Sequence, residues 1–415
     1  MQTEKHYLGG AKWIQNLWVL WFGNFITGLE FSMTMPFMAL FIDTLGHFNN
    51  WSLNLLSGAA FAITFLAKAI VSPMWGKLAD RKGRKLMCLR ASGVMMFTVI
   101  FTGMAPNVWW VIFLRGLQGC FSGYVNNANA IVATEAPHDR SGKAMGTLAT
   151  GNVTGTLLGP LFGGFIAGIF GYRATFYIAG TLMFFVFLST LFLVHEDFKP
   201  IAAAKMRSMK TIIRQLKSPN MLLGIFITTL IIQASATSIT PFISLFIRQL
   251  LHGQGNLALV SGVISAMPGI ATLIAAQPLG NLIDRIGAVK VLTWGLAFAT
   301  ICFIPQIFVT NVWQLGFLRL LVGISDAALL PAVQTLMALN TPADAFDRIF
   351  SYNQSFQAMG SVVGPMIGAV IASVIGYRGV FAMTAIFEFC NLLLIWYDQK
   401  HPYPNWIKKR IANEN

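Results

Sequence analysis

The chain has 415 residues, of which 55% are hydrophobic and 11% charged, and its formal net charge is +14. A charged share so far below the ~25% of soluble domains excludes a water-soluble fold. The positive charge does not indicate a nucleic-acid-binding protein, because the lysines and arginines gather in a few loops between apolar segments and at the end of the chain. An all-α integral membrane protein is the class that remains.

Twelve membrane spans are expected, because apolar runs of about 20 residues, the length that crosses a bilayer, fill most of the chain. In chain order they are predicted at residues 14–42, 53–75, 86–105, 108–133, 142–168, 174–194, 220–247, 257–279, 290–309, 312–338, 347–374 and 379–397. The pattern predicts a six-helix N-terminal half at 1–194, a linker at 195–219, and a six-helix C-terminal half with a short tail at 220–415.

The basic residues also predict how the chain lies in the membrane. Lysines and arginines crowd the 76–90 loop, the linker and the tail, whereas the loops at 46–52, 103–107 and 310–311 have none. Cytoplasmic loops carry this excess of positive charge. Both ends and the linker are therefore expected in the cytoplasm.

Two halves of the chain repeat one another. The stretch Gly76–Lys85 (GKLADRKGRK) returns as GNLIDRIGAVK at Gly280–Lys290, 204 residues later. An offset of 205 carries PFMALFIDTL, which starts at Pro36, onto PFISLFIRQL, which starts at Pro241. Since each predicted half has an even number of spans, the halves are expected to be parallel repeats.

Three motifs carry a family resemblance. Gly76–Lys85 resembles the loop 2–3 signature of the major facilitator superfamily, and RGLQG at Arg115–Gly119 resembles its fourth-helix signature. The glycines between Gly146 and Gly164 have the spacing of the fifth-helix motif of proton-driven exporters. Over nearly its full length the chain resembles the twelve-helix drug/proton antiporters, in particular the MdtG-type and PmrA-type multidrug exporters of bacteria.

The resemblance implies a fold and a function. The fold would be two six-helix halves with the substrate site between them near the midplane. The function would be multidrug efflux from the bacterial inner membrane, in exchange for protons by alternating access, as in antibiotic resistance. No cofactor beyond the proton gradient is implied. The partners would be the lipid bilayer, protons and a small-molecule substrate, with no nucleic acid, and the protein would work as a monomer.

Two groups of residues are expected to act in conformational change. The resemblance implies a cytoplasmic latch at Gly76, Asp80, Arg81, Gly83, Arg84 and Asp284. Glycine permits tight turns, and Asp80 could accept hydrogen bonds from a helix N-terminus. A hinge or seal is expected at Gly155, Gly159, Pro160, Gly163 and Gly164. Four-residue spacing brings a neighbouring helix close and proline favours a kink. The plainer alternatives are a basic turn and helix packing.

Intramembrane charges supply the candidates for proton coupling, because a charge at this depth is costly and indicates function. The candidates are Asp326, Glu30 and Arg115. Glu30 and Lys68 lie at similar predicted depth and could form an ion pair, in a structural or a functional role. Arg319 lies at the repeat position of Arg115 and could form an ion pair within its own half. Glu388 is interpreted as structural.

Polar residues in the spans predict the substrate cavity. They are Lys68, Asn126, Asn127, Gln233, Asn353 and Gln357, among many Phe and Met residues. Lys68 favours a second hypothesis, a dedicated exporter of an endogenous anionic metabolite such as a carboxylate siderophore. A third is a non-transporting receptor or scaffold. The sequence has no phosphate-binding loop and no metal-ligand spacing, so neither an enzyme nor a metal site is expected.

Overall fold

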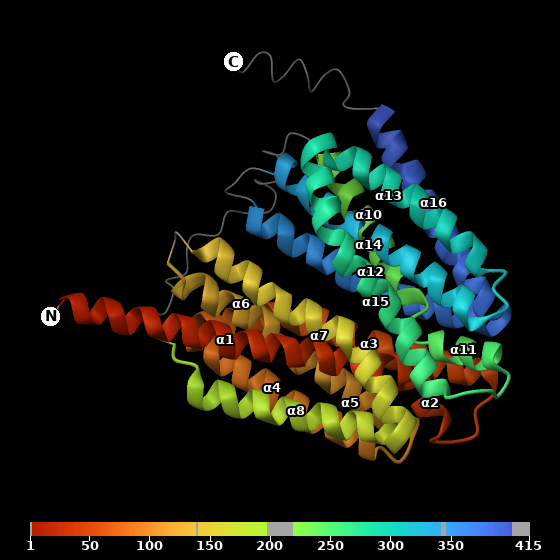
Figure 1. Ribbon diagram of the computed structural model, residues 1–415, viewed down its shortest axis with the longest axis horizontal. Coiled ribbons are helices and arrows are strands. Elements are labelled where there is room, and N and C mark those ends of the chain that lie inside the picture. Colours follow the sequence, from red (N-terminus) through yellow and green to blue (C-terminus); the bar gives the residue numbers. More distant parts are fainter. Residues whose placement is uncertain (1, 138–139, 197–218, 342–345, 401–415) are drawn as a thin grey trace. The chain divides into compact units, whose positions relative to one another are not determined.

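The computed structural model describes residues 2–137, 140–196, 219–341 and 346–400 (Figure 1). Every regular element within these ranges is helical. The elements are α1 (Gln2–Thr34), the 3-10 helix η1 (Met35–Phe37), α2 (Met38–Asp43), α3 (Asn50–Lys82), α4 (Arg84–Met104), α5 (Val108–Phe121), α6 (Tyr124–Glu135), α7 (Ser141–Phe170), α8 (Tyr172–Leu193), α10 (Pro219–Ser238), α11 (Ile243–Leu251), α12 (Leu257–Ile286), α13 (Ala288–Gln306), α14 (Val312–Asn340), α15 (Phe346–Val374) and α16 (Tyr377–Lys400). Most of the predicted linker, and the tail after residue 400, lie outside the described residues.

The fourth predicted span, 108–133, is not the continuous helix that we expected. It is interrupted between α5 and α6 at Ser122 and Gly123, and Gly123 has a φ of 121°. This left-handed conformation suits a residue without a Cβ. Eleven segments of the described chain are therefore long and apolar enough to span a membrane by themselves. The 14 residues of α5 and the 12 of α6 together are long enough for the remaining crossing.

Helices at equivalent positions of the two sequence repeats begin with the same kind of N-terminal cap. The Asn107 side chain accepts hydrogen bonds from the backbone amides of Trp109 (3.1 Å) and Trp110 (3.2 Å) at the start of α5. Its repeat mate Asn311 accepts one from the amide of Trp313 (2.8 Å) at the start of α14. An asparagine at this position satisfies amides that have no partner inside the helix. The twice-occurring Asn-Val-Trp sequence is therefore a helix start.

The twice-occurring Gly-Tyr-Arg sequence fixes a loop in each half. Arg173 donates from Nη1 to the carbonyl of Gly103 (3.0 Å), near the end of α4. Arg378 donates from Nη2 to the carbonyl of Val309 (3.0 Å), after the end of α13. Carbonyls at the end of a helix lack intrahelical partners, and an arginine is well suited to satisfy them. The repeat thus extends to individual hydrogen bonds.

Contacts divide the chain into two compact units. The first unit comprises Met1–Ala204 with Thr240–Gly269, and the second Lys205–Ile239 with Ile270–Asn415. This division differs from the repeat boundary, because α11 and the start of α12 pack within the first unit. In the first unit α1 packs along α7 and α8, and α4 packs along α8 (Figure 1). In the second, α10 packs against α15 and α16, and α13 against α14 and α16.

Candidate transport site

A buried chain of polar side chains joins α5 to α1. Arg115 donates from Nη1 to Oε1 of Gln118 at 2.6 Å, and Gln118 donates from Nε2 to Oε1 of Glu30 at 3.0 Å. Glu30, Arg115 and Gln118 are respectively 0%, 1% and 2% exposed. Gln118 therefore links a cation to a carboxyl group without direct contact between the two. The sequence indicated Glu30 and Arg115 as candidates, whereas Gln118 was named only within the RGLQG motif and was given no role.

The residue at each end of this hydrogen-bonded series has one polar atom without a hydrogen-bond partner in the described structure. Oε2 of Glu30 and Nε of Arg115 are buried and have no hydrogen-bond partner among the described residues. Nη2 of Arg115 instead contacts Sδ of Met35 at 3.4 Å. Burial disfavours a charged carboxylate, while the nearby guanidinium favours it. A carboxyl group under these opposed influences, with one oxygen unoccupied, has the chemistry needed to carry a proton.

The hypothesis that Glu30 pairs with Lys68 is wrong. No ion pair joins them in the described structure, and the bonded neighbour of Glu30 is Gln118 on α5. The face of α1 towards α3 holds Phe31, whose ring packs against those of Phe61 (6.2 Å) and Phe65 (5.7 Å). Equal depth in the membrane was the basis of the prediction. Depth does not determine which face of a helix a side chain occupies.

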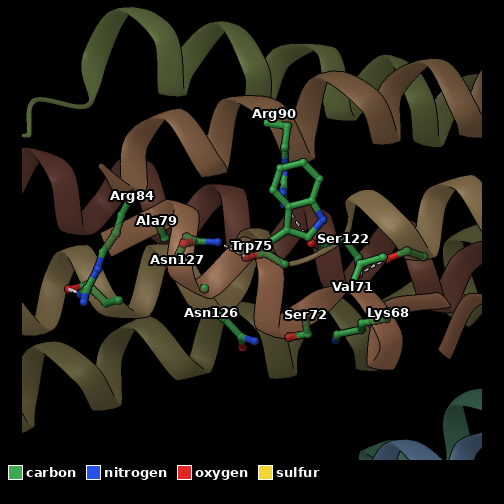
Figure 2. Close-up of a pocket in the computed structure, with 14 residues that line it drawn as sticks. Lys68, Val71, Ser72, Trp75, Ala79, Arg84, Arg90, Ser122, Asn126 and Asn127 are labelled. Atoms are coloured by element: carbon green, nitrogen blue, oxygen red, sulfur yellow. Dashed lines mark hydrogen bonds between the residues drawn. The ribbon is translucent and has the colours of Figure 1, made fainter. Parts of the chain in front are cut away.

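Lys68 lines a cavity of about 220 Å³ within the first unit (Figure 2). The cavity lies among α3, α4, α5 and α6, and Asn126 and Asn127 line it together with Lys68, Arg84 and Arg90. The Asn127 side chain donates from Nδ2 to the Gly123 carbonyl (2.8 Å), where the fourth span is interrupted. Three of the six residues predicted for a substrate cavity therefore share one pocket, and their role in transport remains a prediction.

The other three predicted cavity residues belong to the second unit. Gln357 on α15 donates from Nε2 to Oε1 of Gln233 on α10, at 3.2 Å. Asn353 is 4% exposed, and its Oδ1 accepts a hydrogen bond from the Thr229 hydroxyl at 2.7 Å. Asn353 thus joins the same two helices from a buried position. Their place in a substrate cavity stays a prediction.

Asp326 lies half-buried on α14, two turns after Arg319. Arg319 and Glu388 are its charged neighbours, but no ion pair joins Asp326 to Arg319 in the described structure. Nε of Arg319 and Oε2 of Glu388 are buried and have no hydrogen-bond partner there. The second unit therefore also places an arginine near buried acids, although no glutamine bridges them. The proton-coupling role of Asp326 stays a prediction.

The expected latch contains two repeat-related turns. Gly83 ends α3 with a φ of 93°, and its repeat mate Gly287 ends α12 with a φ of 92°. The backbone amides of Arg84 and Lys85, at the start of α4, donate to the carboxylate of Glu196 at 2.9 and 2.8 Å. An acid is stabilised at a helix N-terminus in this way. The sequence offered this role to Asp80 and gave no sign of Glu196, which lies far away along the chain.

The structure describes the remaining latch residues only in part. The side chain of Asp80 lies outside the described part of the structure. Arg81 and Asp284 are exposed, and nothing lies within 4 Å of where a Cβ on Gly76 would be. Arg84 donates from Nη1 to the carbonyl of Ala130 in α6, at 2.7 Å. The latch therefore remains a prediction from the resemblance.

The glycines of α7 permit close contact between helices. A Cβ at Gly155 would overlap the carbonyl oxygen of Phe25 on α1, and one at Gly163 would overlap that of Met33. A Cβ at Gly159 would overlap the Ser32 hydroxyl. The packing prediction is thus confirmed. The hinge remains a prediction.

Pro160 and Gly164 lie at the contact between α7 and α12 in the first unit. A Cβ at Gly164 would lie 2.9 Å from the Cα of Gly262, and one at Gly262 would overlap the carbonyl of Pro160. The α7 helix continues from Ser141 to Phe170 through this proline. The contact therefore depends on small residues in both helices.

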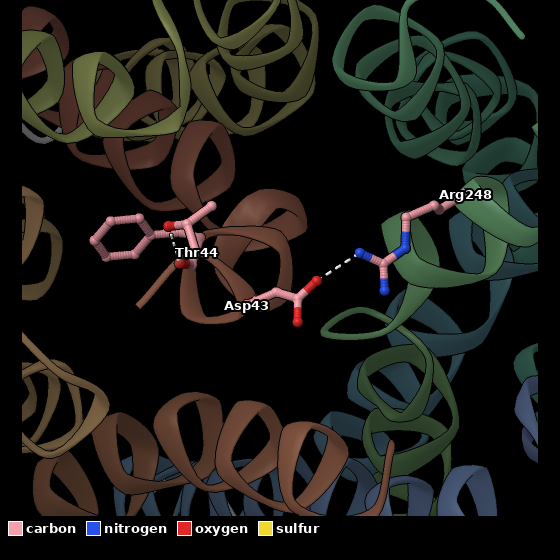
Figure 3. A network of polar contacts seen from close by, with 4 residues as sticks. Asp43, Thr44 and Arg248 are labelled. Carbon is pink, nitrogen blue, oxygen red and sulfur yellow. Dashed lines mark hydrogen bonds and ion pairs between the residues drawn. The ribbon is translucent and has the colours of Figure 1, made fainter. Parts of the chain in front are cut away.

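An ion pair joins positions that the sequence repeat makes equivalent. Arg248 in α11 donates from Nη1 to Oδ2 of Asp43, the last residue of α2, at 2.6 Å (Figure 3). The repeat offset of 205 carries Asp43 onto Arg248. Nearby, the Ser244 hydroxyl donates to the carbonyl of Pro36 at 2.5 Å. These two bonds attach α11 to the end of the first span within the first unit.

Comparisons with known proteins agree with this architecture. The sequence model of the Major Facilitator Superfamily matches residues 20–261 and 225–414. The chain is 46% identical over 384 residues to the multidrug resistance protein MdtG of Escherichia fergusonii, covering 92% of this chain and 94% of that protein. It is 47% identical over 391 residues to MdtG of Proteus mirabilis, covering 94% and 97%.

Solved structures show the same fold. A bacterial homologue of the human lysosomal transporter Spinster, in an inward-facing and occupied conformation, has a TM-score of 0.74 at 15% identity, covering 92% of this chain and 96% of that one. The unoccupied conformation gives 0.75, also at 15% identity, covering 94% and 97%. The predicted fold class and family resemblance are confirmed. The chain is a multi-pass membrane protein and belongs to the Major Facilitator Superfamily of transporters.

Proposed function

We propose that this protein is a secondary active exporter of small amphipathic molecules, driven by proton influx through alternating access. It would lie in the bacterial inner membrane with both termini in the cytoplasm, act as a monomer, and need no cofactor besides the proton gradient. Its relatives named as multidrug resistance proteins support the export of several compounds. The observation that carries the proposal is the buried Arg115–Gln118–Glu30 chain, because the relatives' names say nothing about the energy source.

The chain of hydrogen bonds suggests how a proton would act. A proton from outside would bind the open Oε2 of Glu30 and remove the charge that faces Arg115. The hydrogen bonds through Gln118 would then weaken, since bonds to charged groups are the stronger ones. The loosened contact between α5 and α1 would favour the alternative conformation, in which Glu30 releases the proton to the cytoplasm. Asp326 would carry protons in the second half.

The test is flux in proteoliposomes under an imposed pH gradient, with the amphipathic cation ethidium as probe. Glu30→Gln and Asp326→Asn should each lower gradient-driven ethidium accumulation at least tenfold while ethidium binding persists. Glu388→Gln is the matched control, because it neutralises a buried acid without a proposed coupling role. Full accumulation by the Glu30 and Asp326 variants would contradict proton coupling through these groups.

Two other functions remain as hypotheses with distinct outcomes. Export of an endogenous anionic metabolite is favoured by Lys68, which lines the cavity without a carboxylate partner among the described residues. In that case the same vesicles would accumulate an anionic probe and not ethidium. A receptor or scaffold would move neither probe, and the two-fold repeat gives no reason to prefer that reading.

A further inference from the structure

The cavity of the first unit is lined by three cationic side chains from two helices. Lys68 comes from α3, and Arg84 and Arg90 from α4. None of the three forms an ion pair with a carboxylate in the described structure, although each is partly buried. Partly buried cations without an anionic partner are costly, and they gather where an anion compensates them. Among the described residues no carboxylate balances the Lys68 ammonium, so we expect a bound anion to supply the balancing charge there.

Arg90 is held in place while part of its hydrogen-bonding capacity stays unused. Its guanidinium lies over the ring of Trp75, 3.6 Å from the centroid, and Nη2 donates to the carbonyl of Ser122 at 3.2 Å (Figure 2). Nε and Nη1 are buried against the protein and have no acceptor among the described residues. A stacked arginine is pre-organised, so little conformational entropy is lost when it binds an anion.

The interruption of the fourth span adds a further positive element. Gly123, the N-cap of α6, lines the cavity beside Asn126 and Asn127. Amides in the first turn of a helix have no intrahelical acceptor, and this end carries a partial positive charge. Asn126 makes no hydrogen bond in the described structure, so its amide group is also available. The cavity thus combines fixed cations with neutral donors.

We propose that this cavity is a binding site for a small anion that carries carboxylate or phosphate groups. The α3 residues from Lys68 to Gly76 span about 12 Å at the usual helical rise. Figure 2 shows Lys68 and Arg84 on opposite sides of the cavity, so the cations are spread across it. That spread fits an anion with more than one acidic group, such as a tricarboxylate. A volume of about 220 Å³ suits a molecule of this size. The same chemistry is offered by the headgroup of an anionic phospholipid.

Equilibrium binding tests the site without depending on transport. The full-length protein in phosphatidylcholine nanodiscs is dialysed against radiolabelled citrate at constant ionic strength. Lys68→Gln should weaken citrate binding at least tenfold and remain folded, because the Lys68 ammonium has no hydrogen-bond or ion-pair partner among the described residues. Lys143→Gln, the same change at an exposed position outside the cavity, should stay within twofold of the wild type. Equal affinities in the two variants would overturn the proposal.

A second arm identifies the source of the anion. In nanodiscs that contain phosphatidylglycerol, native mass spectrometry measures the lipid retained by the wild type and by both variants. Citrate binding that is lost in Lys68→Gln supports a soluble anion. If citrate does not bind but phosphatidylglycerol is retained, and Lys68→Gln loses that retention, a lipid headgroup is supported. Absence of both overturns the site. These binding results do not depend on proton-driven ethidium flux. The transport proposal could therefore fail while the anion site is confirmed, and the reverse could also occur.

Discussion

At the scale of single residues, Gln118 is the side chain on which the buried polar chain depends. Gln118→Leu would remove the bridge between Arg115 and Glu30, and each buried group left unsatisfied costs about 1–3 kcal/mol. The variant should therefore unfold at a lower temperature in detergent micelles. Gln254→Leu makes the same change at an exposed position and should have little effect. Identical melting of the two variants would show that the bridge contributes nothing.

The candidate residues for proton coupling were found from the sequence because an intramembrane charge is informative without a structure. Gln118 was missed although it stands three residues after Arg115, a spacing that places both on one helical face. Its partner Glu30 is 88 residues away, so no local pattern connects them. The sequence thus supplied the charged ends, and the neutral bridge required the fold.

At the scale of the helix, the glycines of α7 provide a matched pair of positions. Gly155→Ala would force a methyl group into the backbone of α1, and overpacking of this kind costs about 1–3 kcal/mol. Gly146→Ala, in the same helix, meets nothing within 4 Å and should be neutral or stabilise by up to about 1 kcal/mol. Folded protein recovered after solubilisation, measured by size-exclusion chromatography, should fall only for Gly155→Ala. An equal yield of both would refute the close-contact argument.

Hydropathy predicted the helices and their order, but not the interruptions inside two predicted spans. The fourth span is divided between α5 and α6, and the seventh, predicted at 220–247, is divided between α10, which ends at Ser238, and α11, which begins at Ile243. One apolar run covers 108–133, and a hydropathy average cannot show that Gly123 turns the backbone within it. The predicted ion pair between Glu30 and Lys68 failed for a similar reason. Span length and membrane depth do not give the rotation of a helix about its axis, which decides where a side chain points. The equivalent helix N-caps at Asn107 and Asn311 could be predicted from the repeated Asn-Val-Trp sequence, because capping depends on local sequence.

At the scale of the whole molecule, the pair of Asp43 and Arg248 connects the two repeats. Exposed ion pairs contribute up to about 1 kcal/mol, a factor of up to about 5 in an equilibrium. Asp43→Arg should therefore change the ethidium transport rate by no more than several-fold, with α11 repelled from the end of α2. The double change Asp43→Arg with Arg248→Asp should restore the rate. Failure of the exchange to restore it, at equal protein abundance, would show that the pair is incidental.

The position of that ion pair also bears on how such a chain arose. Two halves with matching segments are what gene duplication produces, and the original single-half protein would have assembled as a symmetric dimer. In such a dimer the same position would set aspartate against aspartate or arginine against arginine. Opposite charges at Asp43 and Arg248 are possible only after the two copies diverged in sequence. Joining two copies of the first half would therefore introduce repulsion where the present chain has attraction.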